Sequence, residues 1–294
     1  MKRGTDMSLS VDGLDQYVQD WHPDPVSDTE LLSARPAAAL AATLDLDCEL
    51  DVGDALPAMW HSVYFAEWSP TSALGADGHP GEGRFMPPIP NRRRMFAGGR
   101  LVVHEPLVLG REATRRAEVV STAVKNGKTG QLLFVTVRYE YSQDGQPRLT
   151  EEHDLVYRSD TGSSTPFTRV DEALSARSAP WAVEPTTHPA LLFRFSALTS
   201  NAHRIHYDTE YAREVEGFPA LVVHGPLLVL YMAELARINC PRPLQRFRYR
   251  LMKPVFLGDA IRVQGDPAVD GDSVELSVVS GAGTIHASAQ ADYA

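Results

Sequence analysis

The chain has 294 residues, 43% of them hydrophobic, and a formal net charge of -10 at pH 7. This length allows two domains of ordinary size, each with a core of its own, while the negative charge disfavours binding to nucleic acid. No run of about 18 apolar residues predicts a membrane span, and the start MKRGTDMSLSVDG lacks the apolar stretch of a signal peptide, so we expect a cytoplasmic protein without membrane contact.

The first domain is expected at 21–158, after a flexible segment at 1–20. Pro57 opens AMWHSVYFAEW, which is apolar on most sides and therefore predicts a short buried helix. Strand-like segments separated by turn signals follow it: GRLVVHEPLVL, RRAEVVSTAVKNG, GQLLFVTVRYEYSQDG and RLTEEHDLVYR. The domain should be one helix and an antiparallel run of strands.

Residues 159–189 are rich in Ser, Thr and Pro, which is typical of an interdomain linker. The second domain, 190–294, repeats the order of the first. Gly225-Pro226 precedes LLVLYMAELARIN, a helix that is apolar nearly all round and must be wrapped by other structure. The strand-like segments QRFRYRLM, DAIRVQG, SVELSVVS and TIHASAQADY come after it.

The two domains also align in sequence. RLVVHEPLVLGRE at 100–112 matches RYRLMKPVFLGDA at 248–260, where Arg, Pro, Leu and Gly coincide and most other positions keep apolar opposite apolar. A buried helix followed by antiparallel strands, present twice, predicts an α+β double hotdog: two modules, each an antiparallel sheet wrapped around a central buried helix.

Immediately before the second helix, the segment NAHRIHYD (201–208) brings two histidines, an amide and a carboxylate together. With Gly217-Phe218 and His224-Gly225 after it, this segment resembles the motif of MaoC-type hotdog hydratases and dehydratases. The closer resemblance is to the branch of mitochondrial-type 3-hydroxyacyl-thioester dehydratases and mesaconyl-C4-CoA or itaconyl-CoA hydratases, which also carry a stretch like RRMFAGG at 93–99. The resemblance covers most of 50–294.

The resemblance implies a hydro-lyase that adds water to, or removes it from, a CoA thioester, with His206 as the group that moves the proton. The position that usually holds a partner acid is Asn201 here, and an amide cannot exchange a proton as a carboxylate can. We therefore expect Asn201 to position the water. During the reaction the thioester carbonyl becomes enolate-like, and its oxygen needs hydrogen-bond donors. Backbone N–H groups at the start of the second helix can supply them, with Gly225 as the first choice and Leu227 as the second. His224 is expected to orient its neighbours.

Two other interpretations of this segment remain open. His203, His206, Asp208 and His224 could bind zinc, although Asp208 more simply caps a helix. The segment could also be a polar turn whose side chains bond the backbone. Cys48 and Cys240 are distant and unpatterned, so no cysteine-based metal site is expected. We expect no cofactor, since CoA is part of the substrate.

The resemblance favours itaconyl-CoA or mesaconyl-C4-CoA, hydrated to citramalyl-CoA, as substrate. A dicarboxylic acyl group would need a guanidinium in the pocket. The residues expected to bind substrate are Arg204, His224, Tyr207, Arg93, Arg94 and Leu227, and those expected near the CoA phosphates are Arg248, Arg250 and Lys253. The alternatives are a fatty-acyl dehydratase acting on CoA or acyl-carrier protein, a thioesterase, and a noncatalytic acyl-CoA-binding protein. A homodimer is expected.

Overall fold

A computed structural model of the chain describes residues 13–90, 92–127, 130–159, 167, 169, 173–176 and 179–294. Of the segment expected to be flexible, residues 1–12 lie outside this description. The 3-10 helix η1 (Leu14–Tyr17) follows, and Leu14 and Val18 are buried against the first half of the sheet, so this part is packed. Within the described residues, no helix has the length and apolarity that crossing a membrane requires.

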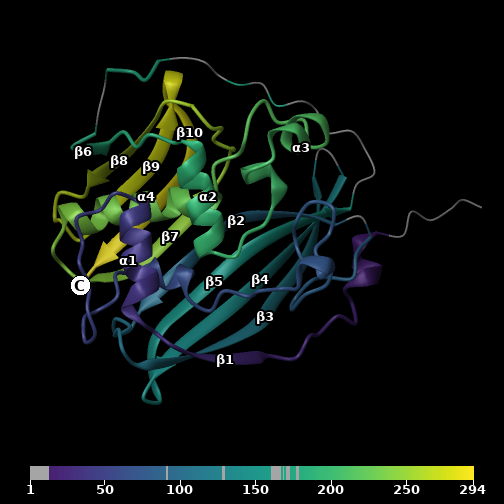
Figure 1. Cartoon of the computed structure of the whole chain (residues 1–294), viewed down its shortest axis with the longest axis horizontal. Coiled ribbons are helices and arrows are strands. Elements are labelled where there is room, and N and C mark those ends of the chain that lie inside the picture. The colour runs from purple at the N-terminus through teal and green to yellow at the C-terminus, as the bar shows by residue number, and fades with distance from the viewer. Residues whose placement is uncertain are drawn as a thin grey trace, which may run out of the picture.

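The described strands form one sheet in the order β1-β3-β4-β5-β2-β7-β10-β9-β8-β6 (Figure 1). Their bounds are β1 Val26–Leu31, β2 Arg92–Val103, β3 Glu112–Gly127, β4 Gly130–Gln143, β5 Gln146–Ser159, β6 Trp181–Val183, β7 Leu244–Leu251, β8 Ile261–Pro267, β9 Ser273–Ser280 and β10 Thr284–Tyr293. This order is symmetric about the junction of β2 and β7, because each half places its first strand at an edge and its second at the centre. The duplicated α+β hotdog predicted from the sequence is confirmed.

Backbone hydrogen bonds repeat between the halves in the register that the sequence alignment gave. Leu56 N donates to Leu107 O at 2.7 Å, and Val223 N donates to Val255 O at 2.8 Å. Leu107 and Val255 occupy matching positions in the aligned segments. Residues 56 and 223 are therefore structural equivalents, and each stands just before the place where the central helix of its half is expected.

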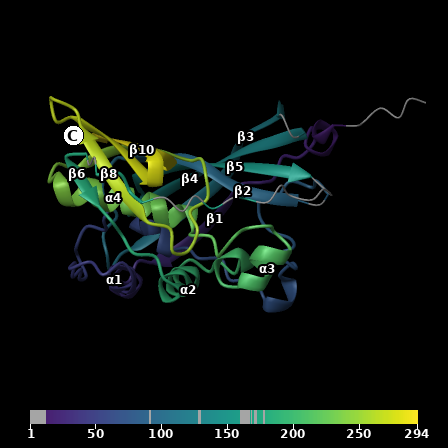
Figure 2. The same cartoon turned by 90° about the horizontal axis from the view of Figure 1, so that it is seen from above.

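In the second half, that helix is α4 (Gly225–Asn239), and almost every side chain along its length from Leu227 to Ala236 is buried. It packs against β6, β7, β8, β9 and β10, as its all-round apolarity predicts. The other α-helices are α1 (Ala34–Thr43), α2 (Pro189–Leu198) and α3 (Thr209–Glu214). Figure 2 shows α1, α2 and α3 together on one side of the sheet.

The helix predicted after Pro57 is wrong. Only a 3-10 turn, η2 (Trp60–Val63), forms there, and Met59 and Phe65 on its two sides have positive φ angles of 70° and 56°. In this conformation the aromatic side chains make tertiary hydrogen bonds. Trp60 Nε1 donates to Glu234 Oε1 of α4 at 2.6 Å, and Tyr64 OH donates to Ser33 O at 2.6 Å. Apolarity indicated burial here, but not the backbone conformation.

The proposed division of the chain at 159–189 stays a prediction. Much of this segment lies outside the described residues, and its described part includes β6, which pairs with β8 at the edge of the sheet. Strands β2 and β7 pair directly between Gly98↔Arg250 and Val102↔Arg246, so the two halves share one continuous sheet.

Candidate active site

His206 ends the short 3-10 helix η4 (Arg204–His206) in the loop between α2 and α3, and its side chain is buried. Its Nδ1 lies 2.7 Å from Val222 O, a carbonyl that can only accept, so the ring carries its proton on Nδ1. Burial lowers the pKa of His206 to about 4, against an opposing effect of the Val222 hydrogen bond. The ring is neutral at pH 7, with the lone pair on Nε2 available to take a proton.

His224 lies directly on this ring. The two imidazoles are stacked with centroids 3.6 Å apart, and His224 Nε2 is 2.8 Å from Ser196 Oγ of α2. Burial, followed by the neighbouring His206 and His203, lowers the pKa of His224 to about 2, so it too is uncharged. His224 is also the N-cap residue of α4, and the stack therefore holds His206 beside the start of the buried helix.

Gly225 is the first residue of α4, so its N–H has no partner within the helix. The N–H of Leu227 donates to His224 O at 3.1 Å and is thus already occupied. A Cβ at 225 would meet the end of the Leu251 side chain of β7, which would have to move to admit it. Of the two donors expected from the sequence, Gly225 is the one free to face an oxyanion, where the helix dipole adds to its effect.

Asn201 has a narrower role than the sequence suggested. Its Oδ1 accepts from His203 N at 3.1 Å, which closes a turn within the loop. One of the two lone pairs of Oδ1 is thereby used, so its second lone pair and the Nδ2 amide are what Asn201 can offer to a water molecule.

The first half contributes residues to the site that the sequence analysis missed. Its loop 75–81 lies against residues 201–208, which contain His206 and are called the catalytic loop from here on. Arg204 N in that loop donates to Asp77 O at 2.8 Å. The His79 ring lies 4.1 Å from the His203 ring, and His203 meets His206 edge to face at 5.6 Å between centroids. The only signal in the sequence is GADGHP at 75–80, and nothing in that pattern indicates that a loop so far away in the chain would reach His206.

Both carboxylate oxygens of Asp77 accept from His79, from its backbone N at 2.9 Å and from its Nδ1 at 3.0 Å. Burial raises the pKa of Asp77, but the hydrogen bonds from His79, together with the electrostatic effect of the nearby imidazoles, lower it to about 2. Burial, with His79 and His206 nearby, lowers the pKa of His203 to about 2. At neutral pH Asp77 is therefore an ionised carboxylate and His203 is a neutral imidazole in contact with the His206 ring.

The zinc alternative included Asp208, but this residue caps α3, as expected. Asp208 Oδ1 accepts from Tyr211 N at 3.0 Å, while its Oδ2 accepts from Arg204. Among the described residues, a different set brings ligand atoms within 4.8 Å of one another: Asp77, His79 and His203. Asp77 and His79 already satisfy each other with a hydrogen bond.

The cations expected to bind substrate or CoA are dispersed. Arg204 pairs with Asp208 and covers the Tyr211 ring, and Tyr207 OH donates to Ala202 O, so both side chains fasten the loop. Arg93 lies 3.5 Å from Glu216, whereas Arg94 lines a pocket.

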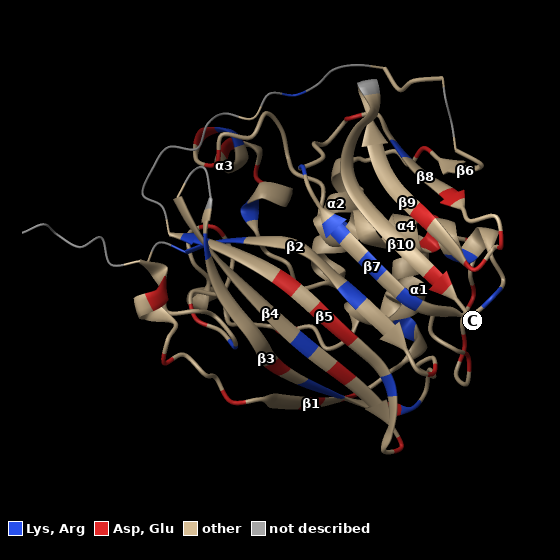
Figure 3. Ribbon diagram, turned by 180° about the vertical axis from the view of Figure 1, so that it is seen from behind, with Lys and Arg blue, Asp and Glu red and all other residues tan. Residues whose placement is uncertain are grey.

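On β7, Phe247 and Tyr249 are buried while Arg248 and Arg250 are exposed between them, on the face of the sheet away from α4. Figure 3 shows basic bands along β7 and acidic bands on neighbouring strands, and Arg248 Nη2 lies 3.2 Å from Asp292 Oδ2. Lys253 follows in the exposed turn after the strand. Arg248 and Arg250 thus lie on the exposed face of β7, and the binding of CoA by these three cations stays a prediction.

Comparison with known proteins places these observations in a family context. Residues 59–257 match the family model described as hydroxyacyl-thioester dehydratase type 2. The chain is 42% identical over 247 residues to mesaconyl-C(4)-CoA hydratase of Chloroflexus aurantiacus, covering 82% of this chain and 85% of that protein. It is 30% identical over 268 residues to the mitochondrial hydroxyacyl-thioester dehydratase type 2 of Schizosaccharomyces pombe, covering 80% and 87%.

Among solved structures, a MaoC-like dehydratase from Phytophthora capsici superposes with a TM-score of 0.68 at 16% identity, covering 96% of this chain and 99% of that one. At this identity the similarity concerns the fold.

Proposed function

The chain belongs to the hydroxyacyl-thioester dehydratase type 2 family and is a hydro-lyase, and from this premise we propose that it hydrates a short dicarboxylic enoyl-CoA, as in the conversion of mesaconyl-C4-CoA to citramalyl-CoA. The 42% identity to a mesaconyl-C(4)-CoA hydratase, which extends over most of both chains, supports this choice of substrate.

In the proposed reaction, His206 Nε2 takes a proton from water while the water oxygen bonds to Cβ of the enoyl group. The π electrons of the double bond move to Cα and onto the thioester oxygen, which becomes an enolate beside the Gly225 N–H. His206 then returns its proton to Cα, and the thioester carbonyl reforms. Water is consumed and His206 regains its neutral state, so the cycle balances without a redox partner.

One observation carries this proposal: the Nδ1 proton of His206 is held by Val222 O, at 2.7 Å, next to the start of α4. That bond leaves a neutral ring with its basic nitrogen free, as proton abstraction from water requires. Asn201, through Nδ2, and His203 are the neighbours able to fix the water.

A panel of enoyl-CoA thioesters tests the substrate: a branched C5 dicarboxylic acyl group, a medium monocarboxylic chain and a long one, each followed by loss of absorbance from the conjugated double bond. We expect the dicarboxylic substrate to have the highest kcat/KM. A preference for the long chain would instead support the fatty-acyl dehydratase alternative, to which the yeast relative's name points. Release of free CoA thiol without loss of the double bond would indicate a thioesterase.

Other expectations remain proposals alongside this one. We propose that the reaction needs no resident metal, that the protein acts as a homodimer, and that it is cytoplasmic. Because two relatives are named as mitochondrial, the location in the cell is to be tested by cell fractionation.

A further inference from the structure

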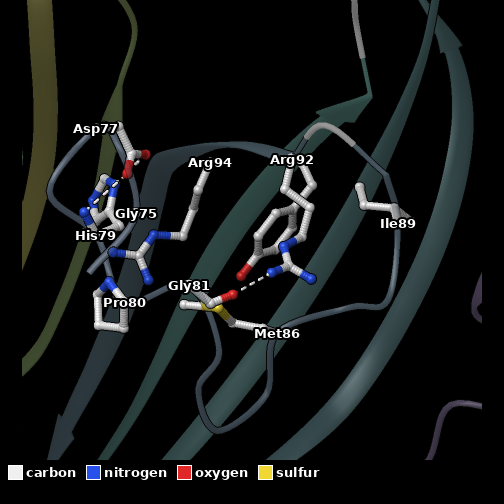
Figure 4. A pocket seen from close by; sticks show the side chains of 10 residues that line it. Gly75, Asp77, His79, Pro80, Gly81, Met86, Ile89, Arg92 and Arg94 are labelled. Carbon is white, nitrogen blue, oxygen red and sulfur yellow. Dashed lines mark hydrogen bonds and ion pairs between the residues drawn. The ribbon is translucent and has the colours of Figure 1, made fainter. Parts of the chain in front are cut away.

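A pocket of ≈ 250 Å³ lies between the loop 75–81 and the first residues of β2, next to the catalytic loop (Figure 4). Its floor includes Tyr157 of β5, which pairs with Arg94 across the strands. The remaining wall is formed by Gly75, Asp77, His79, Pro80, Gly81, Met86, Ile89 and Arg92. Nearly all of these residues belong to the first half, which carries no catalytic motif.

Two guanidinium groups enter this pocket. Arg92 is held in place by carbonyl oxygens, since Nη1 donates to Pro87 O at 3.0 Å and Nη2 to Gly81 O at 2.7 Å. Carbonyls fix its position without neutralising its charge. Arg94 has no ion pair with any described carboxylate, and Figure 4 shows its guanidinium extending toward His79 and Pro80.

The wall also contains the ionised carboxylate of Asp77, which offsets one of these two positive charges, but both of its oxygens are bonded to His79 and not to either arginine. The Tyr157 phenol stays protonated: burial raises its pKa, and the two arginines only partly oppose that effect. The pocket therefore presents two cations and a hydroxyl donor to an occupant, which suits an anionic oxygen group.

The pocket adjoins the reacting groups through a short series of rings. His79 forms part of its wall and contacts the His203 ring at 4.1 Å between centroids, and His203 meets His206 at 5.6 Å.

We propose that this pocket binds the free carboxylate of the acyl group and that Arg94 is the residue that selects dicarboxylic over monocarboxylic substrates. This inference rests on the proposed hydratase function. A planar guanidinium can hold a carboxylate through two parallel hydrogen bonds, and a buried carboxylate without such a partner would be strongly disfavoured. The volume suits one small anionic end better than the whole nucleotide of CoA, since drug-sized ligands need roughly 300–1,000 Å³.

The experiment compares Arg94→Gln, Arg94→Lys and wild type on mesaconyl-C4-CoA and on crotonyl-CoA, which has no second carboxylate. For Arg94→Gln we expect kcat/KM for the dicarboxylic substrate to fall about 10- to 100-fold, the loss typical of a charge-assisted hydrogen bond, with crotonyl-CoA hydration unchanged. Arg94→Lys should recover part of the loss, because it keeps the charge but not the bidentate geometry. Arg100→Gln is the matched control: Arg100 is an exposed residue of the same strand that pairs with Asp154 at 3.0 Å.

Phosphate groups of CoA offer the same chemistry as a carboxylate, so the assay is repeated with pantetheine thioesters, which lack them. A loss that persists with the pantetheine substrates supports the acyl carboxylate, and one that disappears overturns it in favour of a phosphate site. An equal effect of Arg94→Gln on both acyl groups, or no effect on either, also overturns the inference. If wild type hydrates neither substrate, it is the proposed function that fails.

Discussion

His206 combines deep burial with a fixed proton, and this sets a pH dependence. Because burial lowers its pKa to about 4, the neutral form dominates above that pH and the protonated, inactive form only below it. We expect kcat/KM for hydration to be level between pH 6 and 8 and to fall below about pH 5. The measurement is a pH-rate profile within the range where circular dichroism shows a folded protein; a midpoint near 6.5, the value of a solvated histidine, would contradict the buried tautomer.

At single residues, motif matching found the histidine at 206, the ring beneath it at 224 and the glycine at 225, because these lie in one contiguous stretch before a helix with a clear start. It missed Asp77 and His79. Their role follows from the path of a loop, which neither periodicity nor spacing encodes. That Arg248 and Arg250 bind CoA stays a prediction; alternation along β7 puts both side chains on its exposed face.

At the scale of elements, the loop 75–81 is held on the catalytic loop by a close approach at Gly78. Its φ is +89°, and a Cβ there would collide with Ala202 O. We expect Gly78→Ala to displace the loop and lower kcat/KM by about tenfold or more, as a misplaced catalytic group does.

Gly53→Ala is the matched control for this change, since Gly53 has a φ of +98° with nothing within 4 Å of an added Cβ. It carries the same backbone strain without the collision, so its stability should drop by about 1 kcal/mol while its activity is retained. Equal losses of activity in the two variants would show that strain alone, and not contact with the catalytic loop, explains the result.

The turn η2 joins the halves through Trp60, whose Nε1 donates to the buried Glu234 of α4 at 2.6 Å. In Trp60→Phe the carboxylate keeps Arg237 but loses this donor, so we expect the free energy of unfolding to fall by about 1–3 kcal/mol in urea titrations. Trp68→Phe is the control, because Trp68 is 75% exposed and its loss should matter little. A stability unchanged by Trp60→Phe would mean that the contact does not contribute to joining the halves.

Strands were predictable where side chains alternated, as in QRFRYRLM, which forms β7. The central helix was predictable in the second half and not in the first. Both stretches are rich in apolar residues, but in the first the tertiary packing of Trp60, Val63, Tyr64 and Phe65, which are all buried, outweighs helix propensity in setting the backbone conformation.

For the whole molecule, the cluster of buried histidines couples folding to pH. His203, His206 and His224 have lowered pKa values in the folded state, so they bind protons more readily when unfolded at an ordinary value of about 6.5. The stability that these neutral histidines contribute is therefore fully present above pH 6.5 and is lost as the pH falls toward 4. Between pH 7 and pH 5 the free energy of unfolding should decrease by about 2 kcal/mol per histidine. Chemical unfolding at the two pH values measures this loss. The pKa of Glu151 is lowered by His153 and His61 despite its burial, so this residue changes the free energy of unfolding only below about pH 4.3. It therefore does not affect the difference in stability between pH 7 and pH 5. Equal stability at pH 7 and pH 5 would place these rings in contact with solvent.

The duplication gives one chain two similar halves, of which only the second carries the motif with His206. Strands β2 and β7 join the two modules into a single sheet, while η2 replaces the central helix in the half without the motif. The repeat was predictable from the aligned segments, whereas the assignment of the chemistry to the second half stays a prediction. The crossing of loop 75–81 between the halves was not, because it depends on how the modules face each other.

The most direct test of the account is the rate at which His206→Ala hydrates mesaconyl-C4-CoA at pH 7, compared with wild type and with His104→Ala, a variant at an exposed histidine. Loss of a general base should lower kcat by about 10²–10⁴-fold with little change in KM, while His104→Ala remains at the wild-type rate. Hydration by a folded His206→Ala protein at the wild-type rate would contradict the central claim that this imidazole moves the proton.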